Sequence, residues 1–192
     1  DVFVSLVDIK KFKVKVLSPS QGAGIYTVSS IDRISTLYDQ IIKNIKPIDS
    51  DTSLQINSNH FSKRNIELIR NNTSYRVDLE YFYSQGSDEF NPFFIPDDII
   101  RIDIINNFIY LAGSFQVPGK YEYVEGETLG QIIKLSGGLT VDSDTNRIII
   151  TRFINDTDTE QFNYDNFDDA KNVVLEAEDH IYINRKNKYK EH

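Results

Sequence analysis

The chain has no cysteine, no methionine and no tryptophan among its 192 residues. The lack of cysteine excludes a disulfide framework, a thiolate zinc site, an iron–sulfur cluster and a cysteine nucleophile. No stretch approaches 18 uninterrupted apolar residues, so we expect no membrane span in this sequence. Basic residues are in the minority, because 21 Lys and Arg face 29 Asp and Glu and the formal net charge is −8. Such an acidic chain is not expected to bind nucleic acid in general.

Motifs for catalysis and metal binding are also scarce. Residues 142–146 begin like a calcium loop, but Arg147 and Phe153 occupy the places where an EF-hand needs Gly and Glu. A looser calcium site there is the alternative. The three histidines lack the paired spacing of metal ligands, and they are His60, His180 and His192. We therefore expect no catalytic residues, no metal and no cofactor.

The sequence contains an internal repeat, which is its most informative feature. Residues 36–43 recur one residue shorter as 128–134, and the apolar run 12–17 corresponds to 108–111. Each copy also closes with an acidic pair and a strand-like segment. The equivalent landmarks are Arg70 with Asp98, 28 residues apart, and Arg152 with Asp179, 27 residues apart.

The pattern within the second copy predicts the order strand, strand, helix, strand, strand. Residues 108–112 and 121–124 are expected strands joined by a Gly/Pro turn, and 148–150 and 181–183 are the later strands. Thr128 with Gln131 forms a capping-box pattern at the helix start, and the paired glycines after Leu135 predict its end. The first copy has a matching helical stripe before Pro47, made of Ile34, Leu37, Ile41 and Ile45.

These elements predict an α+β fold with two tandem domains, each a small mixed sheet packed on one helix. We expect a first domain over 9–105 and a second over 106–186. Residues 1–8 are interpreted as the closing strand of a preceding domain, and the basic segment 187–192 as a tail.

The second copy resembles the SLBB family, the soluble-ligand-binding β-grasp domains. The resemblance rests on residues 111–121 (LAGSFQVPGKY), 125–129 (EGETL) and 135–140 (LSGGLT). It implies that each domain is a β-grasp fold. The structural residues of the motif are Gly113, Pro118, Gly119, Thr128, Gly137 and Gly138.

Residues 91–100 (NPFFIPDDII) resemble the segment that closes such domains, with Asp97 where Gly is usual. We expect the turn to differ in shape there, because Asp tolerates a positive φ less readily than Gly. Tandem SLBB domains are similar to the periplasmic part of outer-membrane polysaccharide export proteins. This resemblance implies a non-enzymatic part of a ring-shaped conduit, with the polysaccharide, further copies of the chain and an inner-membrane polysaccharide co-polymerase as partners.

Candidate binding residues are few. Tyr121 and Tyr123 lie on one face by the two-residue period of a strand, and exposed tyrosines can stack on sugar rings. Arg70 and Arg152 are candidates for binding an acidic glycan. The alternatives are core packing for the tyrosines and pairing with the closing acids Asp98 and Asp179 for the arginines. A further aromatic run, 81–83, is expected in a strand.

Three functions follow from these observations. The leading hypothesis is the passive export module, whose net negative charge would discourage an anionic polymer from sticking. The second is a small-ligand receptor module, which a bound chromophore would reveal on purification. The third is an enzyme such as a glycan hydrolase, which would need two convergent carboxylates in a cleft.

Overall fold

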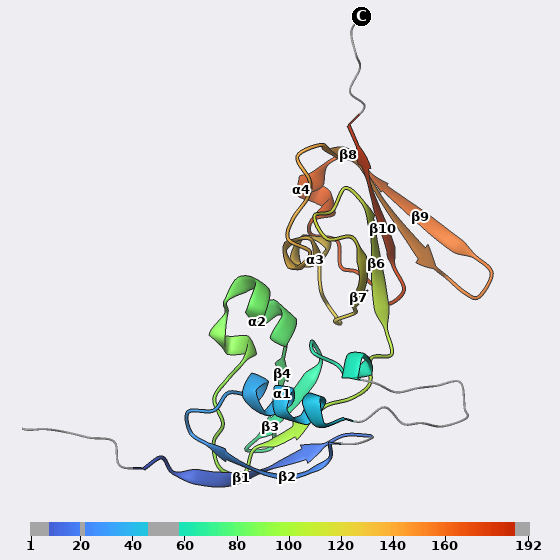
Figure 1. Ribbon diagram of the computed structural model, residues 1–192. Coiled ribbons are helices and arrows are strands. Elements are labelled where there is room, and N and C mark those ends of the chain that lie inside the picture. The colour runs from blue at the N-terminus through green and yellow to red at the C-terminus, as the bar shows by residue number, and fades with distance from the viewer. Residues whose placement is uncertain (1–7, 20–21, 46–57, 187–192) are drawn as a thin grey trace, which may run out of the picture. The chain divides into compact units, whose positions relative to one another are not determined.

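The computed structural model describes residues 8–19, 22–45 and 58–186 (Figure 1). The chain divides into two compact units, residues 1–105 and 106–192. The fold is α+β, and the described residues form two mixed five-stranded sheets and four α-helices. None of the helices in these ranges is long and apolar enough to cross a membrane.

Unit 1 is built on a sheet with the strand order β2-β1-β5-β3-β4. The central pair, β1 with β5, is parallel and the other pairs are antiparallel. Its elements are β1 (Lys11–Leu17), β2 (Gly24–Ser29), α1 (Ile34–Asn44), the 3₁₀ turn η1 (Ser58–His60), β3 (Ile66–Arg70), β4 (Thr73–Val77), α2 (Leu79–Gln85), the 3₁₀ turn η2 (Asp88–Phe90) and β5 (Ile99–Arg101).

Unit 2 repeats this topology with the strand order β7-β6-β10-β8-β9. Again one pair, β6 with β10, is parallel. Its elements are β6 (Phe108–Gly113), β7 (Gly119–Glu122), α3 (Leu129–Leu135), β8 (Ser143–Phe153), β9 (Thr159–Tyr164), α4 (Phe167–Ala170) and β10 (His180–Arg185).

Each sheet buries one face and leaves the other open. In β1, Val14 and Val16 belong to the core together with Leu37 and Ile41 of α1. In unit 2, α3 supplies Ile132 to a separate core. The alternation of strand side chains places the remaining residues on the opposite face, where no helix of the same unit joins them in the core.

The sequence prediction of one helix and four strands per copy is incomplete. Both units hold a further strand, β4 or β9, and a second short helix, α2 or α4. The expected strand at 81–83 is wrong, because these residues lie in α2. Asp78 caps that helix by accepting a hydrogen bond from the Tyr81 N–H at 2.8 Å, and Gly86 ends it with a φ of +71°. These two caps outweigh the strand preference of the aromatic side chains.

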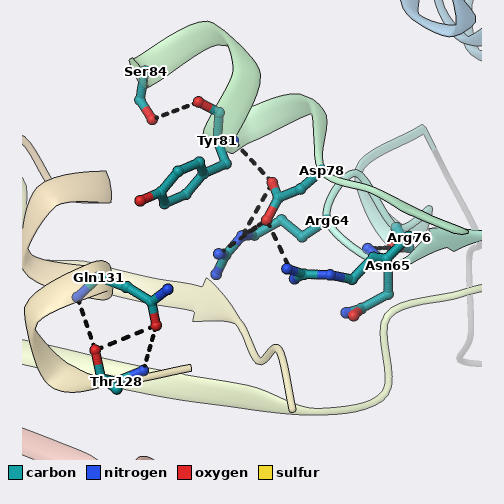
Figure 2. A network of polar contacts seen from close by, with 9 residues as sticks. Arg64, Asn65, Arg76, Asp78, Tyr81, Ser84, Thr128 and Gln131 are labelled. Carbon is teal, nitrogen blue, oxygen red and sulfur yellow. Dashed lines mark hydrogen bonds and ion pairs between the residues drawn. The ribbon is translucent and has the colours of Figure 1, made fainter. Parts of the chain in front are cut away.

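The predicted boundaries of α3 are confirmed. Thr128 and Gln131 form the reciprocal capping box, as the lower part of Figure 2 shows. At the other end, the Gly138 N–H donates to the Ile133 carbonyl and the Gly137 N–H to the Lys134 carbonyl. This is the Schellman pattern, and both glycines have a positive φ.

The helical stripe predicted for α1 is also confirmed, because Ile34, Leu37 and Ile41 are buried and Ile45 packs against them. Pro47, His192, the tail 187–192 and nearly all of 1–8 lie outside the described residues.

Candidate functional site

In each unit, an arginine binds the aspartate that precedes the last strand. The arginine lies in β3 of unit 1 and in β8 of unit 2. Arg70 donates from Nε and Nη2 to the two carboxylate oxygens of Asp98 at 2.9 and 2.7 Å. Arg152 makes the same two bonds to Asp179, both at 2.8 Å. The predicted pairing of these residues is therefore confirmed, and the bidentate geometry is the strong form of this interaction.

These pairs hold the closing turns. Asp98 is 1% exposed and also accepts the Ile95 N–H at 2.9 Å, and Asp179 accepts the equivalent Glu176 N–H at 2.8 Å. Hydrogen bonding to Asp98 raises the pKa of Arg70, and hydrogen bonding to Asp179 raises that of Arg152. Both arginines therefore have a structural role, and about a fifth of each side chain is exposed.

The turn before the last strand of each unit contains a residue with left-handed backbone angles, although that residue is not glycine. Asp97 has a φ of +68°, and Glu178 at the equivalent place has a φ of +66°. Asp97 and Glu178 therefore lie in the left-handed region that a type II turn requires, at the cost of strain. The expectation of a different turn shape is not supported by these angles.

Tyr121 and Tyr123 help to pack the interior of unit 2. Both rings pack against its core, and both are only partly exposed. The Tyr121 hydroxyl donates to the Val117 carbonyl at 2.6 Å and so closes the turn between β6 and β7. The Tyr123 hydroxyl donates to the Leu175 carbonyl at 3.4 Å, and burial raises the pKa of this phenol. The geometry thus favours the packing alternative over stacking on a sugar.

The open face of the second sheet carries a different set of aromatic rings. Tyr110 on β6 stacks on His180 of β10, with centroids 4.3 Å apart and planes inclined by 20°. Phe153 at the end of β8 meets the His180 ring edge-on at 5.7 Å. On the other side, Lys120 of β7 lies 3.3 Å above the Phe108 ring. We call Phe108, Tyr110, His180 and Phe153 the aromatic ladder.

The aromatic ladder crosses three neighbouring strands, and Lys120 extends it to a fourth. The register places Tyr110 opposite both Lys120 and His180, and His180 opposite Thr151. Phe153 is 51% exposed and nearby Tyr182 on β10 is 44% exposed. Phe153 is inclined by 66° to the His180 ring and is half exposed, and such an exposed ring is suited to stacking against the apolar face of a sugar.

Unit 1 has its own aromatic group around α2. The guanidinium of Arg33 lies 4.1 Å from the Phe93 ring and forms an ion pair with Asp88 at 3.0 Å. Its Nη1 also donates to the Asn91 carbonyl at 2.6 Å. This arginine therefore joins the closing segment to the turn η2, which is a structural role.

Arg64 and Asp78 form a fully buried charge pair that was not predicted. Their side chains are 0% and 1% exposed, and Arg64 Nη2 lies 3.1 Å from an Asp78 oxygen. Arg76 approaches the same carboxylate at 3.6 Å (Figure 2). Burial raises the pKa of Asp78 despite these two cations. Because the same aspartate caps α2, the pair joins the start of that helix to the segment that precedes β3.

Groups of acidic and histidine side chains that could hold a metal ion are not found in residues 8–19, 22–45 and 58–186. The acidic run at 142–146 is partly used internally. Asp142 accepts the Thr140 hydroxyl at 2.7 Å, and Asp144 lies 3.6 Å from Arg147.

A scan against protein-family models finds no match, and a search of curated proteins finds none either.

The aromatic ladder and the Arg64–Asp78 pair were missed at the level of sequence for different reasons. Period-two alternation in 108–110 and 180–182 was available as a signal for the ladder. The sequence alone, however, does not show which strands are neighbours in the sheet. Arg64 precedes β3 in an irregular segment, where no periodicity reports burial.

Proposed function

We propose that the chain is a non-enzymatic, tandem β-grasp module of SLBB type in a capsule or exopolysaccharide export protein. In this proposal the units help to build a ring-shaped conduit in the periplasm, and the polymer passes over the aromatic ladder. The single observation that carries the contact is the ladder itself, with its stacked pair and its exposed Phe153.

The proposal also draws on the motif residues. Gly113 ends β6 and Gly119 begins β7, both with a positive φ, and Gly137 and Gly138 end α3. Mixed sheets covered by one main helix on one face are compatible with a β-grasp fold. A passive conduit needs weak, repeated contacts, and an open sheet face offers such contacts to a moving polymer.

The contact is tested by nuclear magnetic resonance with the isotope-labelled chain and polysaccharide purified from the source organism. We expect shifts at the outward residues of β6, β8 and β10. Replacing Phe153 and Tyr182 with Ser should weaken binding about fivefold for each ring that stacks, which corresponds to about 1 kcal/mol. Tyr83→Ser is the control, because Tyr83 is 65% exposed but lies in α2 of unit 1. An unchanged spectrum in millimolar polymer would rule out the direct contact.

The export role is tested separately in cells. Disruption of the gene should lower surface polysaccharide, and unchanged surface polysaccharide would contradict the role. The receptor alternative predicts a bound small molecule, which native mass spectrometry and visible absorbance of the purified chain would detect.

A further inference from the structure

The negative charge of the chain is not spread evenly over its sheets. In β1, Lys11, Lys13 and Lys15 are exposed, and they alternate with core residues such as Val14. The alternation puts all three ammonium groups on the open face of the first sheet, opposite the side that α1 covers. We call these three residues the lysine row.

Neighbouring strands extend the positive charge. The register places Arg101 of β5 beside Glu67 of β3, and Glu67 beside Arg76 of β4. Glu67 is the one carboxylate at the outward strand positions of this described sheet, and it already accepts a bond from Arg101 Nη1 at 2.6 Å. The Ser74 hydroxyl bonds to the same glutamate. Five cations therefore lie at outward positions, and the two arginines among them are already paired, Arg101 with Glu67 and Arg76 with Asp78.

The lysine row carries no such partner. Among the described residues of unit 1, none of the three lysines takes part in an ion pair. Alternate residues of an antiparallel strand lie about 6.8 Å apart, so the row presents a charge at regular intervals over about 14 Å. A linear polymer with repeated anionic groups is complementary to such a row.

The fold itself does not require the lysines. Unit 2 has the same topology, and its strand β6 occupies the place of β1. Where Lys15 pairs with β2 and β5, Tyr110 pairs with β7 and β10, and Phe108 likewise corresponds to Lys13. The same scaffold therefore carries rings in one unit and ammonium groups in the other.

We propose that the lysine row binds the carboxylates of an acidic polysaccharide. This inference rests on the proposed function, and it names the polymer as a uronic-acid type rather than a neutral one. The net charge of −8 disfavours adhesion elsewhere on the chain, so the contact is local and weak. That combination permits an anionic polymer to be guided without being trapped.

The test uses two probes, a hexamer of α-1,4-linked galacturonic acid and neutral maltohexaose. We expect the acidic hexamer alone to shift the β1 amides and the lysine Nζ resonances. Raising NaCl from about 20 to about 300 mM should weaken this binding, because the Debye length falls from roughly 20 Å to roughly 6 Å. The triple variant Lys11→Gln, Lys13→Gln, Lys15→Gln should bind the acidic hexamer at least about tenfold more weakly.

A matched control carries the same loss of charge away from this face. The variant Lys43→Gln, Lys134→Gln, Lys186→Gln removes three exposed lysines from α1, α3 and the end of unit 2. It should bind like the unmodified chain. Equal weakening in both variants would overturn the proposal, as would equal binding of maltohexaose.

Three other outcomes would assign the face differently and would also overturn the proposal. They are equal binding of hexaglutamate, binding to phosphatidylglycerol vesicles instead of the hexamer, and a dimer that the lysine substitutions dissociate. Failure of this inference is distinguishable from failure of the export role. If gene disruption lowers surface polysaccharide but the unmodified chain does not bind the acidic hexamer, only the inference fails.

Discussion

At the scale of single residues, Gly113 shows how the backbone of unit 2 restricts its sequence. The residue leaves β6 with a φ of +87°, and a Cβ there would collide with the carbonyl oxygen of Ile183 on β10. That oxygen cannot move away without losing a hydrogen bond, because it accepts the Ser114 N–H at 2.9 Å. The glycine of the family-like turn is therefore required by a close approach of two strands as well as by its φ.

We predict that Gly113→Ala destabilises unit 2 by about 3 kcal/mol or more, since it combines left-handed strain with a clash against fixed backbone. Gly126→Ala is the control, because Gly126 has a φ of +78° but open space at its Cβ. It should cost only about 1 kcal/mol. Urea unfolding followed by circular dichroism measures both, and equal losses would show that the contact with Ile183 is not decisive.

The charged residues show what sequence can and cannot predict at this scale. The Arg70–Asp98 and Arg152–Asp179 pairs were predictable because the repeat places one such pair in each copy, at nearly the same spacing. Arg64 has no such counterpart, so its ion pair with Asp78 depends on tertiary packing alone. Tyr121 and Tyr123 were assigned to one face of a strand, but periodicity does not say whether that face looks outward or into the core.

At the scale of elements, the two main helices begin in different ways. Thr128 caps α3 with its own side chain, whereas Arg33 at the same place before α1 makes no such bond. Instead, buried Asn91 from the closing segment accepts the Ser35 N–H at 3.0 Å and donates to the Ser35 hydroxyl at 2.8 Å. A residue distant in the sequence thus replaces the local cap.

We predict that Asn91→Ala destabilises unit 1 by about 2 kcal/mol, because it uncaps α1 and leaves the buried Ser35 groups without this partner. Asn172→Ala is the control at the equivalent place of unit 2, where the side chain is exposed. It should cost less than about 0.5 kcal/mol. Thermal unfolding of both variants measures the difference, and similar losses would argue against capping by Asn91.

The elements that sequence reasoning missed are short and locally capped. α4 spans Phe167–Ala170, and Asn166 caps it by accepting the Asp168 N–H at 2.9 Å. So short a helix has no apolar periodicity to detect. β4 and β9 lie at sheet edges and are largely exposed, so they lack the buried alternation that identified the inner strands. The long inner elements were predictable because their burial imposes a regular pattern.

At the scale of the whole molecule, the residues that the structure describes form two separate cores. One consists of residues from unit 1 and the other of residues from unit 2. Each core lies between one sheet face and one main helix, so each unit has the components of an independent cooperative transition. The two repeats therefore need not share their stability, although they share their topology.

We predict that calorimetry resolves two unfolding transitions, and that substitutions assign them. Asn91→Ala should lower the midpoint of one transition only, and Gly113→Ala the midpoint of the other only. For units of about 100 residues, a loss of 2 kcal/mol corresponds to a fall of about 8–16 °C, which is large enough to separate overlapping peaks. Amide hydrogen exchange checks the assignment, because each variant should raise exchange within its own unit. If either substitution moves both transitions equally, the cores are energetically coupled and the two units unfold as one.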